Sequence, residues 1–343
     1  MNAKLVSFLK FILLLAIAFG LLWFVFRGMD PGRILQEMKH ANWLFLFLSI
    51  FLSLVALVSR AYRWQLLIES AGHQSSLKNT TAALMVGYFA NLAFPRLGEV
   101  TRCGSLSKAQ AIPFNMLLGT VIVERTIDVI SLLICILLTA IIEADHLGNF
   151  IGEKIIGPIV DRFTGLMHSP LFLSLALVGL VLLILLFFYL RKSRHSRQGA
   201  SFYRLLKGLG DGLKSVAKLK RPWLFVFHSV FIWVLYYFSM YLSFFALPFT
   251  SGLGPGAALL LLVAGGIGMS APVQGGIGIY HLLVSQGLML YGLTREQGLV
   301  FATLVHGSQI LIIVVLGSLS LLVLFLGNKK TNQQAVSQPR MEA

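Results

Sequence analysis

Residues 171–190 form one continuous apolar run, LFLSLALVGLVLLILLFFYL, without a single charged side chain. A helix needs about 20 such residues to cross a hydrocarbon layer about 30 Å thick, because each residue advances the helix by about 1.5 Å. Comparable runs lie at 6–26, 43–61, 116–142, 223–247 and 299–326. The sequence therefore predicts an all-α polytopic membrane protein with about six full spans.

The composition of the 343 residues agrees with this fold class. Hydrophobic residues make up 57% of the chain, charged residues make up 12%, and the mean hydropathy is +0.82. Soluble domains carry about 25% charged residues, so one soluble core is excluded. Lys4 and Lys10 precede the first run as in a signal peptide, but no small-residue cleavage site follows them. Residues 6–26 are therefore expected to remain as the first span.

Basic residues predict the orientation of the spans, because cytoplasmic loops are enriched in lysine and arginine. Segment 191–222 is a basic loop that should be cytoplasmic, whereas the more acidic segment 143–170 should face outward. The other basic residues expected inside are Lys4, Lys10, Arg60 and Arg63 directly after the second span, and Lys329 and Lys330. We expect a multi-pass protein of a bacterial-type cytoplasmic (inner) membrane, with both termini in the cytoplasm.

The basic loop also explains the net charge of +15 without nucleic acid as a partner, because cytoplasmic loops face anionic lipid. Apolar residues between 202 and 216 recur at helical spacing, which fits either an amphipathic surface helix or an ordinary connector. Cys103 and Cys135 lack metal-ligand spacing, and no cofactor or metal is expected. The polar tail 328–343 is predicted to be disordered.

Two shorter apolar segments end in a proline that is followed three residues later by a glycine. Each segment is too short to span comfortably and continues into a second short segment. Such a pair can enter the membrane and leave by the same face if its turn lies in protein or in a wet cavity. We predict two re-entrant helical hairpins, with two ordinary short spans per segment as the alternative. Their halves are 81–94 with 99–112, and 257–271 with 277–292.

The order of the predicted elements repeats along the chain. Counted from a cytoplasmic N-terminus, about 1–142 and about 171–327 each contain two spans, a hairpin and a span, in opposite orientation. The first hairpin then enters from the inside and the second from the outside. Many secondary transporters have this inverted repeat, and their broken elements meet near the midplane at the substrate site. Residues 1–327 are therefore expected to form a single membrane domain.

Six ionisable residues interrupt these apolar elements: Arg96, Glu99, Arg102, Glu124, Arg125 and Asp128. Glu99 and Arg102 are three residues apart on one helical face and are expected to pair. Glu124 lies about 12 Å and Asp128 about 18 Å from the start of their span. A charge at such depth costs about 2.5–3.5 kcal/mol, so these side chains should face protein or water.

Two interpretations of these charges remain open. In the structural one, Arg96 or Arg102 pairs with Glu124 or Asp128 and ties the hairpin to the span. In the functional one, the same pairs form but one guanidinium stays free. Because an arginine fork matches a phosphate, a phospholipid or polyprenyl-phosphate headgroup is then the expected guest. The candidate substrate-binding residues are Asn91, Arg96, Glu99, Arg102, Glu124, Arg125, Asp128 and Gln274.

Glycine is concentrated at the second hairpin break. Glycine permits a backbone bend or the close approach of a ligand, because it has no Cβ. Close packing of helices through small residues explains the glycines equally well. The predicted structural breaks of the two hairpins are Pro95, Gly98, Pro272, Gly275, Gly276 and Gly278.

These motifs together resemble a known family, the membrane region of lysylphosphatidylglycerol synthases. The motifs are PRLGEVTR at 95–102, ERTID at 124–128, Arg63-Trp64 and PVQGGIG at 272–278. The resemblance covers about 1–327 and implies a flippase-like membrane domain that translocates lipid. The soluble aminoacylating domain of those synthases has no counterpart in this sequence. The resemblance therefore implies the flippase part alone, and some stand-alone relatives are tied to envelope pathways.

Three functional classes follow. In the first, a lipid flippase or transporter, Arg96 and Arg102 receive an anionic (glyco)lipid headgroup, while Glu124 and Asp128 balance charge or carry protons. In the second, the protein is an accessory scaffold whose partners are envelope-biosynthesis proteins. The third is an enzyme acting on a lipid headgroup with Glu99 or Glu124 as general base. The sequence shows no nucleophile elbow, metal cluster or cofactor loop, so an enzyme is not expected.

Overall fold

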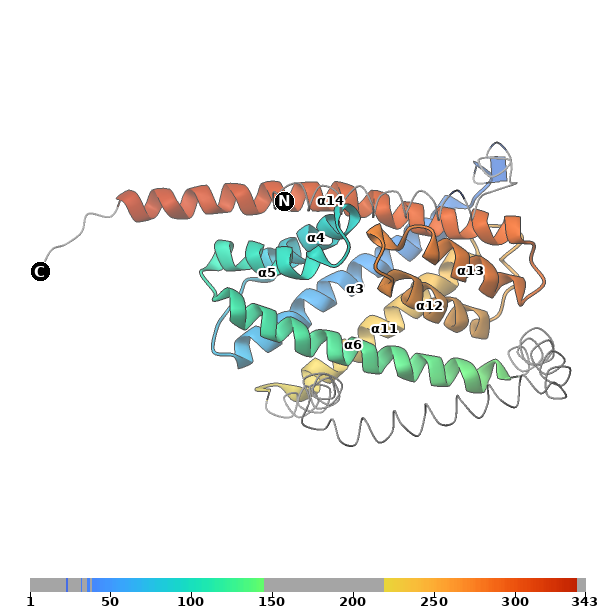
Figure 1. Ribbon diagram of the computed structural model, residues 1–343, viewed down its shortest axis with the longest axis horizontal. Helices are drawn as coiled ribbons and strands as arrows, with labels where there is room; N and C mark the ends of the chain where they lie inside the picture. Colours follow the sequence, from blue (N-terminus) through green and yellow to red (C-terminus); the bar gives the residue numbers. More distant parts are fainter. Residues whose placement is uncertain (1–22, 24–31, 33–35, 38, 145–218, 338–343) are drawn as a thin grey trace, which may run out of the picture.

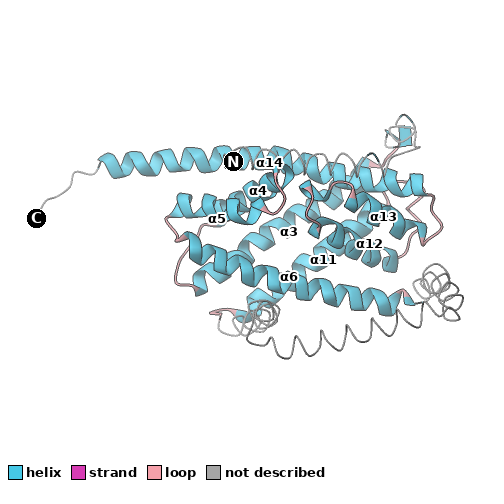
Figure 2. Cartoon of the chain, in the orientation of Figure 1, coloured by secondary structure: helices cyan, strands magenta, loops and turns pink. Residues whose placement is uncertain are grey.

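The computed structural model describes residues 23, 32, 36–37, 39–144 and 219–337. These residues form helices joined by turns, with no strand among them (Figure 2). The helices of the first half are α3 (Trp43–Ser70), α4 (Leu77–Ala93), α5 (Leu97–Gln110) and α6 (Phe114–Ile142). Those of the second half are α11 (Pro222–Phe244), α12 (Pro255–Ser270), the 3-10 turn η3 (Gln274–Gly276), α13 (Ile279–Met289) and α14 (Arg295–Ser337).

Four of the described helices are long and apolar enough to cross a membrane. They are α3, α6, α11 and the Arg295–Leu324 part of α14, and they correspond to four of the six predicted spans. Their outer surfaces expose large apolar side chains such as Leu137, 64% exposed, and Ile141, 73% exposed, which suits contact with lipid rather than water. The predicted spans 6–26 and 171–190, and nearly all of the basic loop 191–222, lie outside the described residues.

Helix α3 is longer than the predicted span, and this corrects the placement of two arginines. The span was expected to end at 61, with Arg60 and Arg63 in the cytoplasm. Instead the helix runs to Ser70, because no glycine or proline interrupts it before Gly72. Arg60 is 8% exposed and Arg63 is fully buried, so both lie inside the protein.

The two predicted hairpins are present as pairs of packed antiparallel helices. Helices α4 and α5 are joined at Pro95 and Arg96, and helices α12 and α13 are joined through η3. Figure 1 shows the two hairpins lying end to end, with their turns facing each other near the middle of the bundle. The turns touch, since a Cβ added to Gly275 would lie 2.8 Å from the Leu92 side chain. The hairpins therefore enter the bundle from opposite ends.

The first long helix described in each half, α3 or α11, runs antiparallel to the other, as an inverted repeat requires. Ser49 and Ser239 share a hydroxyl hydrogen bond of 2.9 Å, and Ser59 bonds His228 at 2.8 Å. Residue numbers thus rise along one helix while they fall along the other. The order helix, hairpin, helix occurs once in each described half, which confirms the predicted order apart from the first span of each half.

Glycine at the first hairpin allows its two helices to approach closely. The Asn91 side-chain oxygen accepts a hydrogen bond of 2.7 Å from the Gly98 backbone N–H, which fixes the turn. A Cβ on Gly87 would lie 2.8 Å from the Gly98 carbonyl oxygen. A Cβ on Gly98 would collide with the Gly87 carbonyl oxygen and the Asn91 side chain. The backbones of α4 and α5 are therefore in direct contact.

The Gly98→Ala variant is expected to lose about 1–3 kcal/mol of stability, because its new Cβ must push the two helices apart. Thermal unfolding of the purified protein in detergent measures this loss. Gly104→Ala on the same helix is the matched control, since a Cβ there meets nothing within 4 Å. It should be neutral or stabilise by up to about 1 kcal/mol. Equal melting temperatures for the two variants would contradict the close packing.

Helix α14 corrects the boundary of the predicted disordered tail. The tail was expected at 328–343, but the helix continues through 328–337 to Ser337. An established helix propagates at little cost through lysine, glutamine and alanine, and no proline occurs in this stretch. Polarity at the end of a membrane span therefore did not imply the end of the helix.

Candidate functional site

A cavity of about 890 Å³ lies between the facing hairpin turns and the long helices around them. Its walls come from both halves of the chain, from α3 to α6 and from α11 to α14. This volume is within the range of about 300–1,000 Å³ that is typical of small-molecule sites. The charged residues on its walls are Arg60, Arg96, Glu99, Arg102, Arg125 and Asp128.

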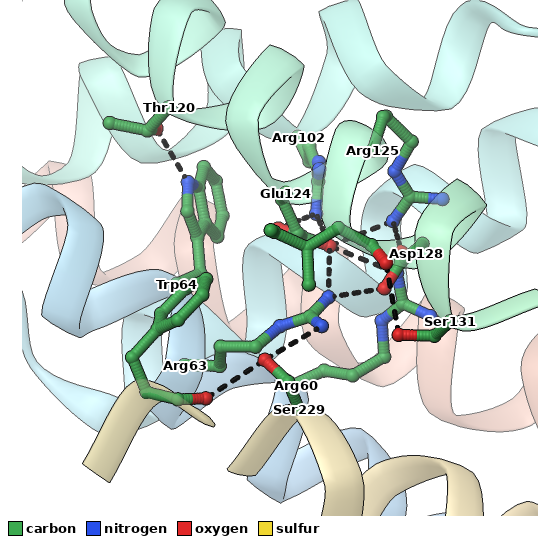
Figure 3. A network of polar contacts seen from close by, with 12 residues as sticks. Arg60, Arg63, Trp64, Arg102, Thr120, Glu124, Arg125, Asp128, Ser131 and Ser229 are labelled. Carbon is green, nitrogen blue, oxygen red and sulfur yellow. Dashed lines mark hydrogen bonds and ion pairs between the residues drawn. The ribbon is translucent and has the colours of Figure 1, made fainter. Parts of the chain in front are cut away.

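A cluster of six ionisable side chains, which we call the arginine cluster (Figure 3), lies at one wall of the cavity, and four of the six border the cavity directly. Its members are Arg60 and Arg63 from α3, Arg102 from α5, and Glu124, Arg125 and Asp128 from α6. Three helices that are separate in sequence are thereby joined through ionic contacts deep in the protein.

Glu124 is the centre of the arginine cluster and is completely buried. Its Oε1 accepts hydrogen bonds from Arg125 Nη2 at 2.7 Å and from Arg60 Nη2 at 2.9 Å. Its Oε2 lies 3.2 Å from Arg102 Nη1, and Arg63 Nη2 lies 3.5 Å from Oε1. All four arginines of the cluster therefore contact this one carboxylate.

Asp128, one turn further along α6, holds three of the same arginines. Its Oδ2 accepts from Arg60 Nη2 at 2.7 Å and lies 3.1 Å from Arg125 Nη2. Its Oδ1 accepts from Arg63 Nη2 at 2.7 Å. Placing the two acids at i and i+4 puts both on one face of α6, so both reach the same guanidinium groups.

Aromatic and hydroxyl side chains fix the orientation of the arginines. The Arg102 guanidinium lies 4.7 Å from the centre of the Trp64 ring, and the Trp64 indole N–H donates to Thr120 at 2.9 Å. Arg60 Nη1 donates to the Tyr236 hydroxyl at 3.3 Å, and Arg63 Nη1 contacts Ser229 at 3.5 Å. These supports come mainly from spans α3, α6 and α11.

The arginine cluster carries more positive than negative charge. Four guanidinium groups face two carboxylates, which leaves a formal excess of two positive charges within the described part of the chain. Unbalanced charge in a low-dielectric interior is costly unless an anion joins it. The composition of the cluster therefore favours the binding of an anion.

Arg125 is the most exposed of the cluster members that border the cavity. Its side chain is 40% exposed, whereas those of Arg60, Arg63 and Arg102 are at most 9% exposed. Its Nη2 bridges Glu124 and Asp128, whereas its Nη1 is neither buried nor bonded to any described residue. Arg125 thus presents an N–H edge to a guest while its other edge is held in place.

Arg102 makes one of its two predicted ion pairs. It contacts Glu124 on the neighbouring span, as both interpretations of the charges allowed, but it does not pair with Glu99 three residues earlier. Tertiary packing places a buried carboxylate closer to it than the local one. Its Nε and Nη2 are buried without a partner among the described residues, so Arg102 contributes charge more than accessible donors.

Arg96 and Glu99 lie at the tip of the first hairpin, on the cavity wall. Arg96 is exposed and has no ion pair within the described ranges. Its backbone is left-handed, with φ 63°, an uncommon conformation for a residue with a Cβ. Such a conformation costs about 1–2 kcal/mol.

The remaining predicted residues lie at the turns. Asn91 borders the cavity, and its amide oxygen also holds the turn at Gly98. Gln274 is buried in η3 and is not among the residues that border the cavity. The glycines of the second turn have positive φ angles, at 55° for Gly275, 74° for Gly276 and 86° for Gly278. These conformations favour glycine and produce the sharp reversal between α12 and α13.

Four polar residues of the site were not among the predicted substrate-binding residues. Arg60 and Arg63 were assigned to the cytoplasm, although Arg63-Trp64 was among the motifs that carried the family resemblance. Tyr88 and Tyr236 border the cavity beside the arginines. Helical spacing gives a usable signal, because Arg60 and Arg63 share one face of α3 with Trp64 and Leu67, which are buried.

Comparison with known proteins places these features in context. The profile of the family described as the lysylphosphatidylglycerol synthase TM region matches residues 11–317. A UPF0104 membrane protein of Methanocaldococcus jannaschii, MJ1595, is 28% identical over 120 residues, which cover 34% of this chain and 35% of that protein. The chain thus spans about a third of the length of this curated relative. No solved structure matches the chain.

Proposed function

The chain belongs to the lysylphosphatidylglycerol synthase TM region family, and from that premise we propose that it is a lipid flippase or transporter. In this proposal, an anionic lipid headgroup binds in the cavity between the hairpin turns and crosses the membrane there. The observation that carries the proposal is the open Nη1 edge of Arg125 beside a cluster with two excess positive charges.

The walls of the cavity support a lipid rather than a soluble anion. Away from the arginines the wall is largely apolar, with side chains from several helices. They include Leu54, Leu57, Leu84, Leu92, Leu132, Met240, Leu262, Ile312 and Ile313. A site that is cationic at one place and apolar elsewhere fits a phosphate attached to an acyl or prenyl chain.

The fold supports transport rather than binding alone. Two hairpins that enter from opposite ends and meet at a polar cavity are the arrangement in which broken helices form a midplane site. By the basic-residue rule, the hairpin of α4 and α5 faces the cytoplasm and that of α12 and α13 faces outward, in a cytoplasmic membrane with both termini inside. A headgroup in the cavity then lies between the entrance from the cytoplasm and the entrance from the outside.

We do not propose catalysis for this site. An enzyme acting on the headgroup would need a general base, and Glu124 was one candidate. Both of its oxygens are occupied by guanidinium N–H groups, and its side chain is fully buried. It therefore cannot contact a substrate hydroxyl within hydrogen-bond reach unless the cluster first comes apart.

A second candidate function is a non-transporting scaffold for envelope lipid synthesis. The engagement of Glu124 by four arginines favours it, because such a network also joins α3, α5 and α6 rigidly. The scaffold predicts that substitutions in the arginine cluster change only the abundance of the protein and of its partners. Transport measured with the purified protein separates the two functions.

Reconstitution in liposomes tests the proposal. Acyl-labelled phosphatidylglycerol should become accessible to a membrane-impermeant quencher about tenfold faster with the protein than in empty vesicles, whereas labelled phosphatidylcholine should not. In Arg96→Gly the guanidinium is lost while the left-handed backbone is retained without strain, so the rate should fall about tenfold.

Arg221→Gln is the matched control for that experiment. Arg221 is exposed, lies outside the cavity and pairs with Glu69 at 3.6 Å, so its loss should leave the rate unchanged. Equal rates for phosphatidylglycerol in protein-containing and empty vesicles would contradict transport. Equal rate losses in Arg96→Gly and Arg221→Gln would contradict the assigned site.

A further inference from the structure

Resting on the proposed lipid-transport function, we propose that the preferred guest is a lipid phosphomonoester, whose headgroup carries two negative charges. Phosphatidate and a prenyl monophosphate have this chemistry. Phosphodiester lipids carry only one phosphate charge, and aminoacylated lipids add positive charge to it. Three features of the described residues lead to this class. The arginine cluster has an excess of positive charge, and the cavity wall carries donors without a bond. The wall also offers little carboxylate to bind a headgroup amine.

The first argument is charge balance. The arginine cluster has four guanidinium groups and two carboxylates, and at the hairpin tip Arg96 and Glu99 add one charge of each sign. The excess of two positive charges is unchanged by that pair. A dianion would neutralise the excess completely, whereas a phosphodiester would leave one positive charge unbalanced in an apolar surrounding.

The second argument is the number of accessible donors. Arg125 Nη1 and the Tyr88 hydroxyl both lie on the cavity wall, are not buried and have no bond to any described residue. The Tyr236 hydroxyl accepts from Arg60, so its own proton is available to a guest. Arg125, Tyr88 and Tyr236 all border this one cavity. A monoester offers them three terminal oxygens, and a diester offers two.

The third argument concerns aminoacylated headgroups. A headgroup with a free amine needs a carboxylate that is not already engaged. On the described part of the cavity wall, Asp128 is held by three arginines, which leaves Glu99. Glu99 lies at the tip with Arg96, so an ammonium group would approach Glu99 and a guanidinium together. The net positive charge of the cavity therefore disfavours the binding of a cationic headgroup.

A pair of lipids that differ by one methyl group tests this inference. Phosphatidate and phosphatidylmethanol with identical acyl chains are titrated against the intact protein in phosphatidylcholine nanodiscs, with binding read by native mass spectrometry. At pH 8, phosphatidate should bind about tenfold tighter or more. The second proton of a phosphomonoester binds with a pKa of about 6. Below that pH both lipids are monoanions, so the preference should disappear by pH 5.

The outcomes of this titration separate the two proposals. Equal affinities at pH 8, or a preference that persists unchanged at pH 5, would overturn the monoester inference while leaving lipid transport standing. Binding of both lipids no tighter than phosphatidylcholine would overturn the proposed function itself. Soluble glycerol phosphate is the third probe: competition as strong as that of phosphatidate would support the monoester charge class but contradict a lipid guest.

A charge-only variant tests the cause of the preference. Arg63 belongs to the arginine cluster but does not border the cavity, so Arg63→Gln removes one positive charge without removing a wall contact. The affinity ratio of phosphatidate to phosphatidylmethanol at pH 8 should fall several-fold towards one, whereas Arg221→Gln should keep the wild-type ratio. An unchanged ratio in folded Arg63→Gln would contradict charge balance. If that variant does not fold, the wild-type pH series still decides the inference.

Discussion

Replacement of Glu124 by glutamine is expected to lower the free energy of unfolding by about 3–5 kcal/mol, the cost of removing one partner of a buried ionic group. Four guanidinium groups contact this one carboxylate, and its loss would raise the excess in the cluster from two positive charges to three. The yield of monodisperse protein from detergent and its melting temperature measure the effect. Both should fall sharply.

Two further variants test the reason for that loss. Glu99→Gln removes a carboxylate that has no ion pair within the described ranges, so stability should change little. The double variant Glu124→Gln/Arg102→Gln restores the wild-type charge excess and should recover part of the stability, because residues in contact are energetically coupled. A double variant less stable than Glu124→Gln would show that burial of the amides, rather than charge, decides the outcome.

Arg125→Gln is expected to reduce the rate of anionic lipid transport by about 10- to 100-fold, which corresponds to the loss of a charge-assisted contact to the headgroup. The protein should remain folded, because Arg125 is the most exposed member of the cluster and its removal lowers the charge excess. Liposome transport and detergent melting are measured on the same preparation. The expected result is a large change in the first and a small change in the second.

Arg125→Lys is the matched variant for this prediction. Lysine keeps the charge but cannot hold Glu124 and Asp128 with one edge while it presents another edge to a phosphate. Its transport rate should therefore lie between those of glutamine and arginine. Wild-type transport in Arg125→Gln would exclude Arg125 from the headgroup site. A collapse of stability in Arg125→Gln would support the scaffold interpretation instead.

Most of the fold was predictable because it depends on length and on helix-breaking residues. The apolar runs have the length of a membrane crossing, and Pro95 and Pro272 mark the turns of the hairpins, since proline cannot continue a helix. The antiparallel order of α3 and α11 followed from the same topology. These are local properties of the chain combined with the thickness of a bilayer.

The partners of the charged side chains were less predictable. Hydropathy falls at Arg60 and Arg63, so a span predicted from hydropathy ends there. The helix itself continues, because no glycine or proline interrupts it at these residues. The predicted pair of Glu99 and Arg102 was a local one, and the buried carboxylate of Glu124 competes with it only after the hairpin docks on α6. Tertiary contacts of this kind are absent from the spacing along one helix.

The balance of charge could not be decided from the sequence for the same reason. With Arg60 and Arg63 assigned to the cytoplasm, the predicted set contained three arginines and three acids, which is neutral: Arg96, Arg102 and Arg125 against Glu99, Glu124 and Asp128. The structure adds two guanidinium groups from α3 and makes the cluster cationic. The assignment of headgroup-binding residues and of transport itself stays a prediction that the experiments above test.

In the proposed transport, a headgroup must pass the contact of the two hairpin turns, where the Leu92 side chain lies against Gly275. This contact is made by the C-terminal end of α4 and the short turn η3. In that proposal, the barrier to crossing would include the packing of the Leu92 side chain against Gly275.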